Sequence, residues 1–107
     1  MIRKAFFMSI EPDAESEYAM RHASVWPELQ NVFKTHGVAH YSIFLLPGTG
    51  YLFAFALIES EALWADIAKS SECVRWWNYM ADLMPLNASG SPEIKVLKEV
   101  FYFAREF

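Results

Sequence analysis

The chain has 107 residues, a formal net charge of −4 and a hydrophobic share of 54%, which includes nine Phe, five Tyr and four Trp. The acidic balance argues against nucleic-acid binding, which depends on Lys and Arg against phosphate. The sequence has no basic amphipathic face and no apolar run long enough to cross a bilayer, so nothing in it indicates a membrane protein. The lone cysteine, Cys73, excludes an internal disulfide and a cysteine-based metal site. We therefore expect one cytoplasmic domain spanning residues 1–107.

The first part of the chain predicts a strand followed by an interrupted helix. Residues 2–10 are rich in apolar side chains, as in a strand. Pro12 suits an early helical position, and Gly37 ends the helical pattern. In between, helical spacing links Ala14, Tyr18, His22, Val25, Leu29 and Val32. Pro27 lacks an N–H, so we expect it to kink or restart the helix around residues 23–26.

The second part predicts a hairpin, two short helices and a final strand. The expected elements are strands 38–46 and 51–58 joined by the turn 47–50, helices from Ser60 and from Ser71 to about Met84, a loop over 85–92, and a strand over 95–103. The resulting order is β-α-β-β-α-β. This order predicts an α+β fold of the ferredoxin-like type.

The strand expected at 51–58 is apolar on both faces. A sheet covered by helices on one face should alternate apolar and polar residues, yet Tyr51, Phe53 and Phe55 alternate with Leu52 and other apolar residues. The second face therefore needs a cover. A homodimer that packs sheet against sheet is the simplest one, and the loop around Asn87 or the C-terminal tail is the alternative.

Tyr18 and His22 are the first candidate site residues, because their spacing places both on one helix face. Tyr41 is in phase with Ile43 and Leu45, so its hydroxyl points towards His22 if that strand face meets the helices. A purely structural interpretation stays open for both: His22 as a satisfied boundary residue, and Tyr41 as a strand-end aromatic.

Trp76 and Trp77 are the second candidates. Helical neighbours point about 100° apart, so both cannot belong to the expected core stripe of Cys73, Trp77, Met80 and Met84. A tryptophan combines a flat apolar face with one N–H donor, which suits a sugar ring, although dimer packing is an equally physical role. We assign Trp26 and Trp64 to packing and Cys73 to an inert buried thiol. The sequence contains no phosphate-binding or dinucleotide motif and no helical His pair for a metal.

Several blocks of the chain carry a specific combination of residues: Met1–Phe6, Glu17-Tyr18 with Arg21-His22, Val25–Leu29, Tyr51–Ala54, Arg75-Trp76-Trp77 with Met80, and Glu99–Tyr102. In these blocks, and in register over nearly the whole length, the chain resembles the L-rhamnose mutarotase family. The resemblance implies a dimeric α+β barrel of ferredoxin-like subunits that interconverts the α and β anomers of L-rhamnose without a cofactor.

The resemblance also implies roles for individual residues. His22 corresponds to the proton donor, and the sugar contacts correspond to Tyr18, Tyr41, Trp76 and Trp77. Two features depart from the family pattern: Ala23 stands where the residue is usually polar, and the tail 104–107 runs past the usual end.

Anomer exchange requires the sugar ring to open and close, with a proton delivered to the ring oxygen and another removed from the anomeric hydroxyl. An imidazole with an ordinary pKa near 6.5 suits this exchange. We expect His22 to be the acid, a tyrosine or water near Tyr41 to carry the other proton, and Trp76 and Trp77 to hold the methyl-bearing side. Two alternatives stay open: a non-catalytic sugar-binding module, and another cofactor-free enzyme on this scaffold, such as a monooxygenase.

Overall fold

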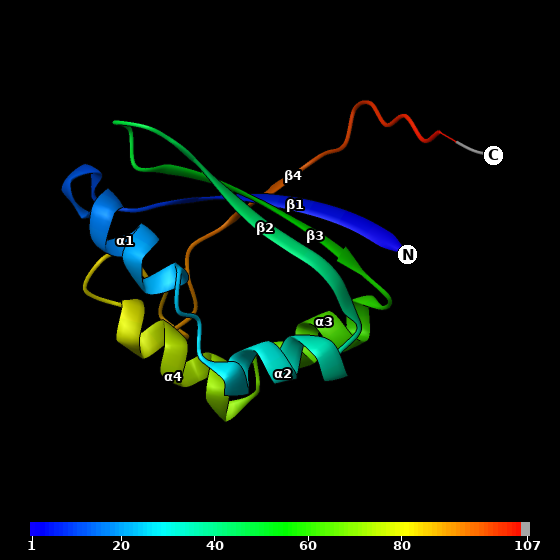
Figure 1. Ribbon diagram of the computed structural model, residues 1–107, viewed down its shortest axis with the longest axis horizontal. Helices are drawn as coiled ribbons and strands as arrows, with labels where there is room; N and C mark the ends of the chain where they lie inside the picture. The colour runs from blue at the N-terminus through cyan, green and yellow to red at the C-terminus, as the bar shows by residue number, and fades with distance from the viewer. Residues whose placement is uncertain (106–107) are drawn as a thin grey trace.

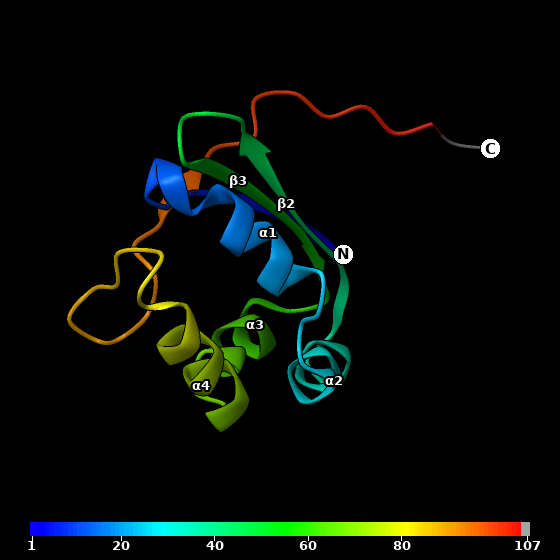
Figure 2. The same cartoon turned by 60° about the vertical axis from the view of Figure 1, so that its left-hand side comes forward.

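The computed structural model, which describes residues 1–105, contains a four-stranded antiparallel sheet in the order β2-β3-β1-β4. The strands are β1 (Ile2–Ser9), β2 (Val38–Leu46), β3 (Tyr51–Ile58) and β4 (Lys95–Leu97). All helices lie on one face of this sheet (Figures 1 and 2). The predicted α+β, ferredoxin-like arrangement is confirmed.

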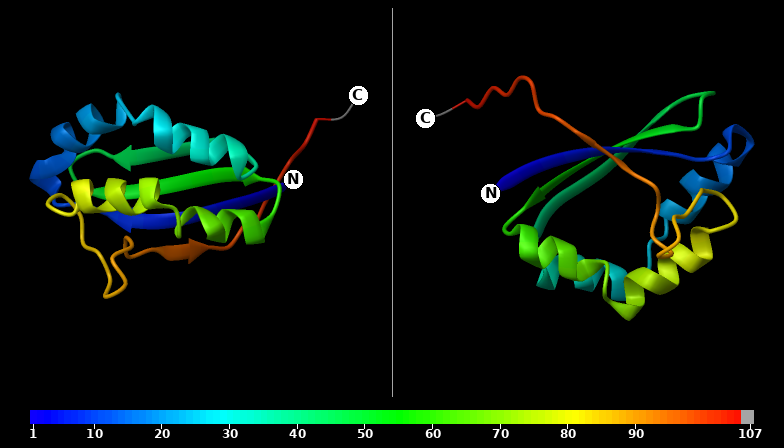
Figure 3. Two further views of the ribbon diagram at one scale, coloured as in Figure 1. Left: turned by 90° about the horizontal axis from the view of Figure 1, so that it is seen from below. Right: turned by 180° about the vertical axis from the view of Figure 1, so that it is seen from behind.

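The helices form two rows across the sheet (Figure 3). They are the 3-10 turn η1 (Pro12–Ala14), α1 (Glu15–His22), α2 (Pro27–Thr35), α3 (Glu61–Ile67) and α4 (Ser71–Met80). None of the helices within residues 1–105 is long and apolar enough to cross a membrane.

Proline residues set two of the helix ends. Pro27 starts α2, and Trp26 before it is extended with ψ 135°, because a proline disfavours the helical conformation of the preceding residue. The predicted interruption is thereby confirmed, and His22 becomes the last residue of α1. Helix α4 ends at Met80, earlier than the predicted Met84. Pro85 disfavours continuation of the helix through Met84, and residues 81–83 form a turn instead.

The two faces of β3 meet different surroundings. The inner side chains are almost completely buried beneath the helices, with Leu52 and Ile58 at 0% exposure. On the outer face, Tyr51 and Phe53 stay 47% and 40% exposed, and Phe44 on β2 is 66% exposed. The strand is apolar on both faces, as the sequence predicts, and residues 1–105 of this chain leave the outer face open.

The C-terminal segment differs from the prediction. The strand expected over residues 95–103 covers only Lys95–Leu97, which pair with β1 at the edge of the sheet. Beyond Leu97 the chain runs away from the helices (Figure 1), and Phe101 and Phe103 are 81% and 74% exposed. An apolar pattern favours a strand, but a strand also needs a neighbour for its backbone hydrogen bonds, and the described chain offers none there.

Neither proposed cover from within the chain closes the outer face, because Phe44, Tyr51 and Phe53 stay exposed. The tail contacts this face only at its edge, where the Arg3 guanidinium hydrogen-bonds the Glu99 carboxylate at 2.8 and 2.9 Å and lies 3.2 Å from the centre of the Tyr102 ring. The loop around Asn87 instead lines the pocket on the helix side. Of the tail expected over 104–107, residues 106 and 107 lie outside the described residues.

Gly50 ends the turn before β3 and accepts a hydrogen bond from the Ile10 N–H at 2.8 Å, and its conformation predicts a large cost of substitution. It has φ 72°, and an added Cβ atom would lie 2.2 Å from the Ile10 carbonyl oxygen. Gly48 has φ 82° but no heavy atom within 4 Å of such a Cβ. Both Gly→Ala changes carry the left-handed strain of about 1–2 kcal/mol, whereas only Gly50→Ala adds the clash. We expect its loss of unfolding free energy in urea to exceed that of Gly48→Ala by about 2 kcal/mol; equal losses would contradict this packing.

Candidate active site

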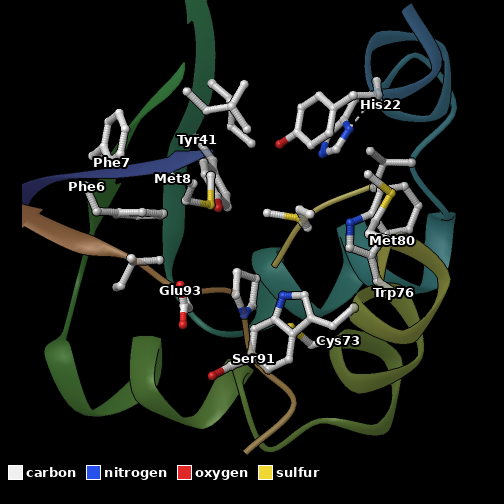
Figure 4. A pocket seen from close by; sticks show the side chains of 18 of the residues that line it. Phe6, Phe7, Met8, His22, Tyr41, Cys73, Trp76, Met80, Ser91 and Glu93 are labelled. Carbon is white, nitrogen blue, oxygen red and sulfur yellow. Dashed lines mark hydrogen bonds between the residues drawn. The ribbon is translucent and has the colours of Figure 1, made fainter. Parts of the chain in front are cut away.

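An open pocket of about 1470 Å³ lies between the inner face of the sheet and the helices. Side chains from β1, β2, α1, α3, α4 and the loop before β4 line it (Figure 4). The five predicted site residues, Tyr18, His22, Tyr41, Trp76 and Trp77, all contribute to this lining. The structure therefore brings the candidates together, and their individual roles stay predictions.

His22 ends α1 with its two ring nitrogens in different surroundings. Nδ1 lies 3.0 Å from the Tyr18 carbonyl oxygen. A carbonyl oxygen only accepts hydrogen bonds, so Nδ1 carries the hydrogen and donates it. The other nitrogen, Nε2, points towards the pocket (Figure 4). In the neutral ring Nε2 is then the nitrogen with the free lone pair.

Aromatic rings hold the imidazole in this orientation. The Tyr18 ring stacks on it with a centroid distance of 4.1 Å and an interplanar angle of 27°. The Trp76 ring meets it edge-on at 5.3 Å and 90°. With a hydrogen bond at Nδ1 and rings on two sides, the imidazole is fixed while its remaining nitrogen stays open to the pocket.

Burial lowers the pKa of His22 below its ordinary value, because removal from water disfavours the charged imidazolium. The hydrogen bond to the Tyr18 carbonyl raises the pKa but is the smaller effect. At neutral pH the ring is therefore predominantly neutral, with a hydrogen on Nδ1 and a basic Nε2.

Tyr41 lies on the side of β2 that faces the helices, as its phase with Ile43 predicts, and both residues line the pocket. Its ring contacts Phe33 and Trp64, each at a centroid distance of 5.5 Å. Burial raises the pKa of Tyr41 and of Tyr18 well above the ordinary range for tyrosine. Both hydroxyl groups thus keep their protons at neutral pH, which makes them hydrogen-bond partners rather than bases.

The inner stripe of α4 corrects one prediction. Its buried residues are Cys73, Trp76 and Met80, so Trp76, rather than Trp77, is the tryptophan in the core stripe. Trp77 borders the stripe and lines the pocket from a partly buried position. Which of the two tryptophans faces the core depends on how α4 is rotated about its axis. The sequence of α4 has large apolar residues that fit either rotation.

The remaining assignments divide between packing and the pocket. Trp26 packs on Trp76, with ring centres 5.0 Å apart at 87°, so its assignment to packing is confirmed. Trp64, also assigned to packing, packs against the core beside Phe6 and Tyr41 and in addition lines the pocket. The sequence offers no spacing signal that links it to Tyr41. Cys73 is buried as predicted, and burial raises the pKa of its thiol to about 12, which disfavours the reactive thiolate.

The loop before β4 supplies polar side chains that the sequence did not indicate. Ser91 and Glu93 line the pocket on the side away from His22 (Figure 4). They lie in a segment without helical or strand periodicity, so no pattern in the sequence assigns them to a face. Within residues 1–105, no group of three His, Cys, Asp or Glu side chains is placed to hold a metal ion.

Known proteins resemble this chain over nearly its whole length. A family model described as L-rhamnose mutarotase matches residues 3–103. An L-rhamnose mutarotase of Yersinia pestis (strain Pestoides F) is 52% identical over 102 residues, which cover 95% of this chain and 98% of that protein.

Solved structures agree with the sequence comparison. The crystal structure of an L-rhamnose mutarotase from Formosa agariphila superposes with a TM-score of 0.87 at 36% identity, covering 97% of this chain and 100% of that one. A dimeric ferredoxin-like protein from an uncultured marine organism has a TM-score of 0.68 at 12% identity over 96% of this chain and 98% of that one, which shows the fold alone. The whole-length family match and the 52% identity show that this chain belongs to the L-rhamnose mutarotase family.

Proposed function

We propose that the protein is an isomerase that interconverts the α and β anomers of L-rhamnose in the pocket beside His22, without a cofactor. Family membership supports the reaction and the sugar. The site is assigned from the different surroundings of the two imidazole nitrogens. Nδ1 hydrogen-bonds the Tyr18 carbonyl oxygen, and Nε2 faces the pocket.

The reaction breaks and re-forms the bond between the anomeric carbon and the ring oxygen. His22, expected from the sequence to act as the acid alone, serves both transfers in this proposal because its resting ring is neutral. Nε2 first takes the proton of the anomeric hydroxyl, and the imidazolium then donates a proton to the ring oxygen as the ring opens. Both oxygens are bonded to the same carbon, so one nitrogen can serve both with a small displacement. The aldehyde group rotates, the reverse transfers close the ring on its other face, and no net proton is consumed.

Aromatic side chains provide the sugar contacts in this proposal. Trp76 and Trp77 offer flat apolar surface and an N–H donor to the methyl-bearing side of the ring. Tyr18 and Tyr41 keep their hydroxyl protons, because burial raises the pKa of both groups, and so they hydrogen-bond sugar hydroxyls.

The outer face of the sheet supports a homodimer. Phe44 and Phe53 are register partners on neighbouring strands, and both are well exposed in the single chain. A contiguous apolar face of this kind on a protein in water favours burial against a second copy. We propose that two subunits pack sheet against sheet as an α+β barrel.

We also propose that the protein is cytoplasmic.

Replacing His22 tests the catalytic assignment. We expect His22→Ala to lower the rate of anomer exchange of L-rhamnose by about 10²–10⁴-fold, the usual contribution of acid–base help, while the protein stays folded. Saturation-transfer NMR measures the exchange directly. Unchanged exchange in the variant would remove His22 from its role, and sugar binding by the wild type without faster exchange would leave a non-catalytic binding module.

The direction of the His22 pKa shift predicts the pH dependence. The neutral imidazole is the reactive form, and burial lowers its pKa below the ordinary value near 6.5. Enzymatic exchange, after subtraction of the uncatalysed rate, should be flat at neutral pH and fall as the pH drops through that lowered pKa. A rate that rises as the pH falls from 7 towards 5 would mean that the resting imidazolium is the reactive form.

A charge on the outer face tests the dimer. Phe53→Asp places a carboxylate where two sheets would meet, and we expect it to convert the dimer to a monomer in light scattering coupled to size exclusion. Val74→Asp, a change on the exposed side of α4 at a similar exposure of 42% against 40%, is the matched control and should remain dimeric. A monomeric wild type would contradict the proposal.

A further inference from the structure

Arg21 is the residue next to His22, and its side chain points away from the pocket to the far end of α4. Although it is charged, the side chain is only 12% exposed. The guanidinium donates to both carboxylate oxygens of Asp82, at 2.9 and 3.0 Å, and to the Tyr79 carbonyl oxygen at 2.7 Å. It also bonds Glu17 on its own helix at 3.0 Å. One side chain thus links the end of α1 to the end of α4.

These two helix ends carry neighbouring walls of the reaction site. His22 is the last residue of α1, and Trp76 lies one helical turn before the Tyr79 carbonyl that Arg21 binds. Between the helices, the His22 and Trp76 rings meet edge-on at 5.3 Å. The Arg21 link therefore restrains the position of the imidazole relative to the Trp76 ring, in addition to the contact between the two rings.

The geometry of the link restricts the two helix ends relative to each other. A bidentate arginine–carboxylate pair restricts both distance and angle. Asp82 is 64% exposed, while the Arg21 side chain is only 12% exposed, so the mostly buried guanidinium stays where its partners hold it. The Tyr79 ring, whose centre lies 4.5 Å from the guanidinium, further limits its movement. Arg21 makes its polar contacts with none of the five site residues.

We propose that Arg21 is a positioning residue, which sets the separation of the His22 imidazole and the Trp76 ring by clamping α1 to Asp82 and the Tyr79 carbonyl. The proposal rests on the proposed mutarotase function of the same pocket. Proton transfer is sensitive to displacements of about 1 Å, which can cost about 10²-fold in rate. The clamp should consequently affect kcat more than KM, because Tyr41 and Trp77 still hold the sugar.

Two variants break the clamp from its two sides. In Arg21→Gln the charged fork is lost, and we expect kcat for anomer exchange to fall about 10- to 100-fold with KM changed less than about threefold. Asp82→Asn leaves Arg21 and its bond to Glu17 in place but removes the charged partner beyond α4, and we expect a smaller fall in kcat of the same kind. Arg21→Lys keeps one ionic contact and should recover part of the loss. Asp66→Asn breaks the exposed pair of Asp66 with Lys69, 3.5 Å long and outside the pocket, and is the control that should leave kcat unchanged.

The double variant shows whether the two residues act as one unit. If Asp82 acts through Arg21, Arg21→Gln with Asp82→Asn should be no slower than Arg21→Gln alone. The proposal would be overturned if the kcat losses of the two single variants multiply in the double variant, or if the folded single variants keep wild-type kcat. It would also be overturned if the variants lower only the melting temperature. Should Arg21→Gln fail to fold, Asp82→Asn decides by the same kcat criterion. If the wild-type protein does not speed anomer exchange, the proposed function itself is rejected. That outcome differs from the outcomes that reject only the role of Arg21.

Discussion

The hydrogen bond from His22 Nδ1 to the Tyr18 carbonyl oxygen decides which atom of the imidazole can reach a substrate. The bond spans one turn of α1, which ends at His22, while Pro27 starts the separate helix α2. The same end of α1 leaves the ring between Tyr18 and Trp76, half withdrawn from water. Burial then lowers the pKa of His22 and keeps the ring neutral at the pH where the reaction is expected to run. A break in one helix thereby produces a fixed base at the edge of a pocket.

The sheet serves two purposes with the two sides of the same strands. Inward-facing residues such as Leu52 and Tyr41 form the floor of the pocket and the core under it. Outward-facing aromatic residues such as Phe53 remain open in the single chain. Because successive side chains of a strand point to opposite faces, neither purpose restricts the other. The scaffold can therefore hold a site and an association surface without a separate element for each.

Most of the fold was predictable from the sequence because it depends on local signals. The strand pattern of residues 51–58, the turn over 47–50 and the interruption before Pro27 all appear where the residues indicate them. The final strand was predicted too long, at 95–103 instead of Lys95–Leu97. Apolar alternation reports that a segment can form a strand, but the partner that would pair with it depends on the tertiary arrangement.

The site was predictable where helical spacing connects residues, and less so elsewhere. Spacing alone placed Tyr18 and His22 together, and strand phase placed Tyr41 on the same side. The rotation of α4, which makes Trp76 rather than Trp77 the core residue, follows from packing against the other helices. Glu93 on an irregular loop reaches the pocket only through the path of the chain in three dimensions. Where the spacing left a structural alternative open, as for His22 and Tyr41, the predicted role of the residue came from the resemblance to the family.

The central claim is that Nε2 of His22 meets the sugar while Nδ1 stays bonded within the helix. Nitrogen-15 NMR of histidine-labelled protein, titrated with L-rhamnose, tests it most directly. We expect the Nε2 resonance of His22 to shift on binding and the Nδ1 resonance to keep the signature of a protonated, hydrogen-bonded nitrogen. A sugar that binds without moving the Nε2 resonance, or a neutral ring protonated on Nε2, would contradict the account.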